Sequence, residues 1–312
     1  MGIAIGLGLS VFPFETAKAF WRWVALCEDS AVDSIWQTDR LVSREPMLEC
    51  MSTMAALAGG TTRLKFGMNV ASVGLRDPLL LAKQCATIDV LSEGRLLPAF
   101  GLGHVLAPDW QATGRPTKGR GKRSDEALEI IGRLWHEEKV DFHGEFFTLE
   151  GATIAPRPVQ KRLPLWLGGS SEAAVRRTAR FGTGWLAGLE TPDQVAPVVR
   201  AIKAAAKAAG RRIDDEHYGA GIPFRFGSWD EPAVKRQAES YAKRFKRDPS
   251  AYFAVGDTEA IIACLRAYVG AGVSKFVLRP LAGGDDIMAQ TQRLIDEVLP
   301  AIPTLAVVPV EA

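Results

Sequence analysis

Glycines and short polar residues at the ends of apolar runs are the parts of this chain best suited to chemistry. The clearest case is Leu167–Glu172, where Gly168, Gly169 and Ser170 lie between a strand-like run and a helical pattern that begins at Ser171. Two glycines let a backbone come close to a ligand, and a helix start offers unpaired N–H groups and the positive end of a dipole. This corner predicts a phosphate site. A tight turn with a serine N-cap explains the same sequence without a ligand.

A second glycine-rich turn, Gly101–His104, follows the preceding strand-like run. It is not a dinucleotide fingerprint, because no G-x-G-x-x-G follows and the next segment does not resemble a helix. His104 could donate a hydrogen bond to a ligand or to a developing anion, which makes it a candidate catalytic residue. The alternative is a solvated loop histidine.

Polar residues also stand at the ends of three other strand-like runs. In an α/β barrel the carboxyl ends of the strands carry the active site, so we expect these residues to bind a ligand there. The alternatives are a local ion pair of Asp39 with Arg40 and a surface ion pair for Arg279. The candidates are Trp36, Asp39, Asn69, Ser72 and Arg279, the last as an anion clamp.

The segment Arg115–Arg123 contains five basic residues with glycines between them. It is either a solvated charged loop or a mobile lid that meets an anionic cofactor tail or substrate. The chain has no H-E-x-x-H, no His/Cys metal spacing, no nucleophile elbow and no P-loop. These absences argue against a zinc hydrolase, a serine hydrolase and a P-loop nucleotidase, and no metal ligand is predicted.

Alternating strand and helix patterns would position these residues. Parallel strands separated by helices indicate an α/β fold, and a count of eight favours a closed TIM (β/α)8 barrel over an open sheet, which remains the alternative. The predicted strands are 3–9, 34–38, 64–70, 96–100, 165–168, 184–187, 217–226 and 274–279, and the predicted helices are 16–29, 47–57, 77–91, 124–135, 171–181, one starting near 191, 231–246, 257–271 and 285–298.

Two stretches depart from the alternation. Residues 104–123 form a long polar loop after the fourth strand, and 140–163 lie before the fifth strand, with a hairpin predicted over 140–151. Such insertions at the top of a barrel usually form lids or substrate walls. No linker suggests a second domain, so we expect one domain over residues 1–312.

Composition narrows the class of protein. The chain has 312 residues, 47% of them hydrophobic, and a net charge of +2, which is too small to predict binding to nucleic acid or an anionic membrane. Its four cysteines lie far apart in helical patterns, which favours buried free thiols in a reducing cytoplasm. The apolar start, Ile3–Phe14, is too short to span a bilayer. We expect a soluble cytoplasmic protein.

Several blocks of the sequence resemble those of bacterial luciferase-like flavin-dependent oxidoreductases, and they occur in the family's order. One departure is Thr183, which replaces the family's usual aspartate. The blocks are Thr87–Arg95 with Gly101–Gly103, Ser124–Trp135, Phe142–Phe147 with Pro156–Gln160, Leu167–Ser170, Ala179–Trp185, Val255–Asp257 and Ala271–Val273.

The resemblance implies a TIM barrel that binds reduced FMN or the deazaflavin F420. It places the cofactor phosphate at Gly168, Gly169 and Ser170 and the ring contacts at the ends of strands two to four, here Asp39, Asn69, Ser72 and His104. The leading hypothesis is a monooxygenase in which reduced FMN, supplied by a separate reductase, reacts with O2 to oxygenate a small organic substrate. The alternatives are F420-dependent hydride transfer and a catalytically idle flavin-binding barrel.

Asp39-Arg40 is a departure that affects the predicted mechanism. Luciferases carry a catalytic histidine at the end of strand two, and many F420 enzymes show Asp-His there. The general acid or base therefore stays open between Asp39 and His104. The family often forms dimers, and neither the oligomeric state nor the substrate can be deduced from the sequence.

Overall fold

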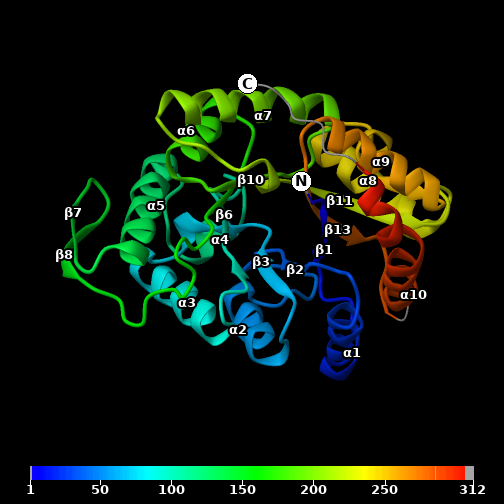
Figure 1. Ribbon diagram of the computed structural model, residues 1–312, viewed down its shortest axis with the longest axis horizontal. Coiled ribbons are helices and arrows are strands. Elements are labelled where there is room, and N and C mark those ends of the chain that lie inside the picture. Colours follow the sequence, from blue (N-terminus) through cyan, green and yellow to red (C-terminus); the bar gives the residue numbers. More distant parts are fainter. Residues whose placement is uncertain (1, 285, 306–312) are drawn as a thin grey trace.

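The computed structural model describes residues 2–284 and 286–305 and shows a parallel β-sheet that curls round on itself (Figure 1). Parallel pairing links β13 to β1 and continues through β2, β3 and β5 on one side and through β11, β10, β9 and β6 on the other. β5 and β6 are separated by Pro98 alone. The strands are β1 (Ala4–Leu9), β2 (Ser34–Gln37), β3 (Lys65–Met68), β4 (Ala71–Ser72), β5 (Leu96–Leu97), β6 (Ala99–Gly101), β9 (Trp166–Gly168), β10 (Gly184–Ala187), β11 (Tyr218–Phe226) and β13 (Lys275–Pro280).

Helices surround the sheet and alternate with its strands along the chain, as the sequence predicts (Figure 1). The α/β class with a curled parallel sheet is therefore confirmed. No helix in the described part of the chain is both long and apolar enough to cross a membrane. The helices are α1 (Ala17–Glu28), α2 (Cys50–Gly60), α3 (Pro78–Leu91), α4 (Asp109–Ala112), α5 (Arg120–His136), α6 (Glu172–Phe181), α7 (Pro192–Ala208), α8 (Pro232–Phe245), α9 (Thr258–Gly270) and α10 (Asp286–Arg293).

Side-chain caps fix several helix starts where the sequence predicts them. Thr16 accepts a hydrogen bond from the N–H of Ala19 at 3.1 Å, and Asp77, followed by Pro78, accepts one from Leu80 at 2.9 Å. Helix α2 starts three residues later than predicted. Its cap is Glu49, which accepts from the N–H of Ser52 at 2.7 Å, and glutamate is not a typical N-cap residue.

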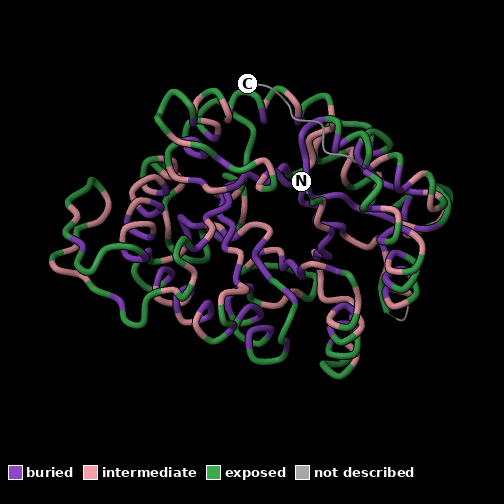
Figure 2. The backbone as a smooth tube through the Cα atoms, in the orientation of Figure 1, coloured by how far each residue is buried: buried purple, intermediate pink, exposed green. Residues whose placement is uncertain are grey.

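One large layer and two smaller clusters of buried apolar side chains hold the fold together, and one of the smaller clusters lies around Phe253. The larger layer lies between the sheet and its helices, and the buried strands appear purple inside the green outer faces of the helices in Figure 2. A smaller cluster fills the inside of the curled sheet and consists of Trp36, Ala99, Trp166, Leu186 and Val277. The four cysteines are free, with Cys27, Cys50 and Cys85 buried and Cys264 partly buried, as predicted.

The region before β9 differs in part from the prediction. The loop predicted over 104–123 contains the short helix α4, and α5 begins at Arg120 rather than Ser124. The earlier start was missed because α5 has no side-chain cap and instead follows Gly119, which has a left-handed φ of 73°. The predicted hairpin is confirmed as β7 (Val140–His143) paired with β8 (Thr148–Ala152).

Glu28 ties the end of α1 to the chain before β3. Its carboxylate accepts hydrogen bonds from the backbone N–H groups of Thr62, Arg63 and Leu64 at 2.7–2.9 Å. Burial alone would raise the pKa of Glu28, but these hydrogen bonds lower it to about 2.

Candidate functional site

The structure brings two of the predicted residues together at Gly221 of β11. A methyl group added at Gly221 would lie 3.4 Å from Asn69 Nδ2 and 3.7 Å from Arg279 Nη2. Arg279 Nη2 also donates to the carbonyl of Gly221 at 3.3 Å. Asn69 follows β3 and Arg279 lies on β13, so side chains from opposite parts of the sheet meet at its carboxyl edge.

The corner between β9 and α6 has the bare backbone that the sequence predicts. Gly169 has a φ of 107°, which disfavours any side chain, and both Gly169 and Ser170 are exposed. The carbonyl of Gly169 is held by Trp185 Nε1 at 2.8 Å, and Ser171 caps α6 by accepting from Ala174 N–H at 3.3 Å. An anion could therefore approach the start of α6 without meeting a side chain from the two glycines.

The first turn of α5 lies beside Arg177, in the second turn of α6, and carries positive charge of its own. A methyl group at Gly121 would lie 3.8 Å from Nη2 of Arg177, which is buried on α6 and paired with Asp125. Nε of Arg120 is buried and has no hydrogen-bond partner among the described residues. Of the neighbouring arginines Arg176 and Arg177, only Arg176 faces solvent. The sequence placed Arg120 in a basic loop but gave no signal that singled it out.

Asp39 is held in a buried ion pair with Arg76, not with its neighbour Arg40. Its carboxylate accepts from Arg76 at 2.7 and 2.8 Å, from the N–H of Ser72 at 2.9 Å and from the thiol of Cys50 at 3.3 Å. The side chain of Asp39 is only 2% exposed. Arg40 lies instead beside Asp109, at 3.7 Å.

The cluster of Asp39, Glu49 and Cys50 also has the geometry of a metal site, since one ligand atom from each lies within 4.8 Å of the others. However, Arg76 Nη2 donates to all three side chains at 2.8, 3.0 and 3.3 Å, so a guanidinium supplies the positive charge there. Burial alone would lower the pKa of Arg76, but its hydrogen bonds to Asp39 and Glu49 raise it above the usual range. Burial and the charge of Asp39 raise the pKa of the Cys50 thiol.

Ser72 lies next to this cluster, and the loop that carries His104 lies beside Ser72. A methyl group at Gly103, whose φ is 72°, would lie 3.0 Å from Ser72 Oγ, so the loop that carries His104 touches the end of β4. The carbonyl of His104 accepts from Trp110 Nε1 at 3.0 Å, while its side chain is exposed. The catalytic role of His104 stays a prediction.

Trp36 lies below the mouth and not on it. Its side chain is fully buried, with Nε1 donating to Ser34 Oγ at 2.9 Å. Methyl groups at Gly6 and Gly67 would come within 2.9 and 2.6 Å of the indole ring, so two glycines on the flanking strands make room for it. Trp36 supports the sheet from inside and exposes no surface to a ligand.

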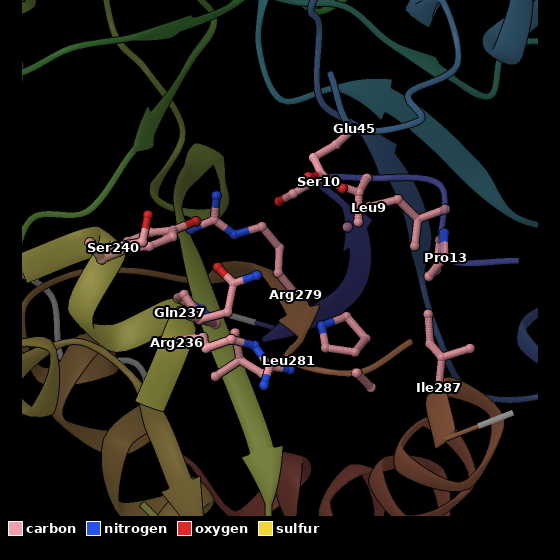
Figure 3. A pocket seen from close by; sticks show the side chains of 16 residues that line it. Leu9, Ser10, Pro13, Glu45, Arg236, Gln237, Ser240, Arg279, Leu281 and Ile287 are labelled. Atoms are coloured by element: carbon pink, nitrogen blue, oxygen red, sulfur yellow. The ribbon is translucent and has the colours of Figure 1, made fainter. Parts of the chain in front are cut away.

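A cavity of about 460 Å³ lies at the carboxyl ends of β1, β11 and β13, beside α8 (Figure 3). Sequence reasoning identified only Arg279 among its lining residues. Glu45 lies in the loop after β2, at the carboxyl edge of the sheet, and the same rule could have found it. The lining residues of α8 do not follow a strand end, so the rule that polar residues at strand ends line the site could not identify them. The polar lining consists of Ser10, Glu45, Arg236, Gln237, Ser240, Tyr241 and Arg279.

Two of the sequence blocks are explained by contacts that fasten the segment before β9. The carboxylate of Asp89 accepts from the backbone N–H groups of Val159 and Gln160 at 2.9 and 3.1 Å and from the Gln160 side chain at 2.7 Å. Glu126 accepts from the backbone N–H groups of Glu145, Phe146 and Phe147 at 2.7–3.1 Å and so fastens the hairpin turn. Asp89 and Glu126 therefore hold the segment before β9 in its position beside helices α3 and α5.

A family model described as luciferase-like monooxygenase matches residues 5–253. The chain belongs to the luciferase-like monooxygenase family. The prediction of a luciferase-like oxidoreductase is thereby confirmed at the level of the family.

Individual relatives agree with this membership. An uncharacterized protein of Mycobacterium tuberculosis is 35% identical over 170 residues, which are 54% of this chain and 57% of that protein. An F420-dependent glucose-6-phosphate dehydrogenase of Amycolatopsis mediterranei is 24% identical over 91% of this chain and 94% of its own. Among solved structures, an F420-dependent secondary alcohol dehydrogenase superposes with a TM-score of 0.83 at 20% identity, covering 97% of this chain and 99% of its own, which shows the shared fold.

Proposed function

We propose that the protein is a flavin-dependent oxidoreductase whose cofactor lies across the carboxyl edge of the sheet with its phosphate at Gly168, Gly169 and Ser170. The observation that carries this proposal is the bare corner at the start of α6. It combines a glycine with a φ of 107° with the exposed backbone at Gly169 and Ser170, directly before α6. A phosphate needs backbone N–H donors, which a helix start offers together with the positive end of its dipole.

The first candidate reaction is oxygenation of a small organic substrate by reduced FMN and O2, with a separate reductase as the source of reduced FMN. The family model carries the description of a monooxygenase, which supports this reading. The second candidate is direct hydride transfer with F420, because the relative that aligns along 91% of the chain has that dependence in its name. In either case the bound cofactor supplies the redox chemistry, and the protein binds, orients and excludes water.

We infer different tasks for the predicted residues from their contacts. Asn69 and Ser72 would contact the cofactor ring, because both lie at the carboxyl edge. Asp39 would act as a positioning residue for Ser72, since all of its contacts are already made with protein groups. His104 remains the candidate that could move a proton to or from a substrate at the mouth of the sheet.

Further parts of the proposal concern the whole molecule. We take the curled sheet to be a TIM (β/α)8 barrel in one domain, with insertions after its fourth and before its fifth strand that form walls of the substrate site. The protein would work in the cytoplasm on a small molecule, and a homodimer is the family's usual assembly.

Titration of the purified protein with FMN, reduced FMN and F420 tests the function. Micromolar binding of reduced FMN together with substrate-dependent O2 uptake is expected, whereas tight F420 binding without FMN affinity would select the second candidate. Failure of both cofactors to bind would refute the proposal. Cofactor binding without turnover over a broad substrate panel would leave a flavin-binding protein that is not an enzyme.

A further inference from the structure

The cavity beside α8 contains a guanidinium without an acidic partner. Arg279 is half-buried, its Nε is fully buried and unpartnered, and its one hydrogen bond within the described residues is the 3.3 Å bond to Gly221. The remaining N–H groups of Nη1 and Nη2 have no partner among the described residues and can donate to a ligand, whereas the buried Nε–H offers no surface to one. A buried charge without a counter-charge is unfavourable, so an anion in the cavity would stabilise it.

Other polar groups of the lining surround this guanidinium. Figure 3 shows Arg279 reaching from β13 toward Ser240 of α8, with Gln237 beside it and with Glu45 near Ser10 on the far side of the cavity. Arg236 lies one residue before Gln237 and has no ion-pair partner among the residues that the structure describes. The lining thus provides two arginines without an ion-pair partner among the described residues, of which Arg279 points toward Ser240 and Arg236 toward Leu281 (Figure 3).

The rest of the lining is apolar. It is made by residues of β1, of the chain after it, of β11 and of the chain around the start of α10, namely Leu9, Val11, Pro13, Pro223, Leu281 and Ile287. A volume of about 460 Å³ accommodates a small molecule of several carbon atoms. The ligand that matches both parts has one charged end and an apolar body.

The charge of the lining selects the kind of anion. Two arginines and one glutamate give the lining a net charge of +1. A monoanion neutralises that charge, while a dianion such as a phosphate monoester would be repelled by Glu45.

We propose that this cavity binds a small, largely apolar carboxylic acid as the substrate, with its carboxylate on Arg279 and with Arg236 adding positive charge to the lining. The assignment rests on the proposed function, because Arg279 joins the cavity to Asn69 at the proposed cofactor site. Helix α8, which presents Arg236, Gln237 and Ser240, is then the element that determines substrate specificity.

The test is calorimetric titration of the full chain, with and without cofactor, using hexanoate, 1-hexanol and hexyl phosphate as probes. Hexanoate should bind saturably and more tightly than the other two. Arg279→Gln should weaken hexanoate binding about tenfold or more, because a charge-assisted hydrogen bond is lost. Arg236→Gln should weaken it about two- to fivefold, since Arg236 is exposed. Arg244→Gln, on the same helix but outside the lining, is the matched control and should not change it.

Equal binding of hexanoate and hexanol, no binding of hexanoate, or unchanged affinity in a folded Arg279→Gln variant would each overturn the assignment. Tighter binding of hexyl phosphate would overturn the choice of a monoanion. If Arg279→Gln does not fold, the surface variant Arg236→Gln decides. If Arg279→Gln loses affinity for flavin but not for hexanoate, Arg279 binds the cofactor and not the substrate. Because hexanoate binding is also measured without cofactor, it can fail or succeed independently of flavin binding.

Discussion

Removal of Arg76 should destabilise the protein strongly, because it would leave the carboxylate of Asp39 buried without its counter-charge. The two hydrogen bonds from Arg76, at 2.7 and 2.8 Å, would be lost, and only the N–H of Ser72 and the Cys50 thiol would still contact Asp39. The side chains of Arg76 and Asp39 are 12% and 2% exposed, so water cannot easily replace the guanidinium. Breaking such a pair costs about 3–5 kcal/mol, and we expect that loss for Arg76→Met.

Urea denaturation of a small set of variants measures this effect. The double variant Arg76→Met/Asp39→Asn should recover part of the loss, since it removes both charges. Arg176→Met is the matched control: its pair with Glu172 is 3.6 Å long and lies in solvent, so its removal should change the free energy of unfolding by less than about 0.5 kcal/mol.

A loss below about 1 kcal/mol for Arg76→Met would refute this account of the cluster. So would a double variant that is no more stable than the single one. Because Asp39 holds the N–H of Ser72, Arg76→Met should also weaken cofactor binding, while Arg176→Met should not.

Three further predictions concern the corner, the loop histidine and acid stability. Gly168→Ala should fold normally, because the new methyl group meets no atom closer than 3.6 Å. It should nevertheless weaken flavin binding about tenfold, because the methyl group obstructs the corner. Gly169→Ala should lower the melting temperature, because a residue with a side chain pays about 1–3 kcal/mol to adopt a φ of 107°. His104→Ala should lower kcat by about a hundredfold with little change in cofactor affinity. Unchanged steady-state turnover would show that His104 is a solvated loop residue without a catalytic role. The pKa of Glu28 is about 2 in the folded protein and about 4.3 in an unfolded chain, so its stabilisation is present above that higher pH and is lost as the pH falls between the two. Denaturation curves between pH 3 and 7 should show a smaller acid dependence for Glu28→Gln, and identical dependence would contradict the assignment.

Elements with local signals were predictable from the sequence. The strand Gly184–Ala187 and the helix that starts after Asp77 follow from short apolar runs and capping residues, which act within a few positions. The start of α5 was not predictable, because it follows a left-handed glycine and has no side-chain cap. Strand β12 (Ala254–Gly256) was also missed, since three residues carry too short a pattern and its pairing with β11 is a tertiary contact.

The sequence predicted that the candidate site residues lie at one edge of the sheet, but it did not predict which residues they contact. Strand ends and glycines indicated Gly168 and Asn69 because parallel strands share one carboxyl edge. The partner of Asp39 could not be deduced, because Arg76 lies 37 residues away and Arg40 is the obvious neighbour in sequence. The cavity beside α8 was missed because several of its lining residues lie on a helix, whereas the prediction considered only residues at the ends of strands.

The bonds that Asp89 makes to Val159 and Gln160 have a consequence for engineering. They fix the base of the segment that carries the β7–β8 hairpin to helix α3, which lies 70 residues earlier in the chain. A chimera that exchanges this hairpin with that of a relative should therefore place its junctions inside residues 137–158 and keep Asp89, Val159 and Gln160 unchanged. Junctions beyond Gln160 would replace the residues that Asp89 binds. The transplanted hairpin would then no longer be held in its position relative to helix α3.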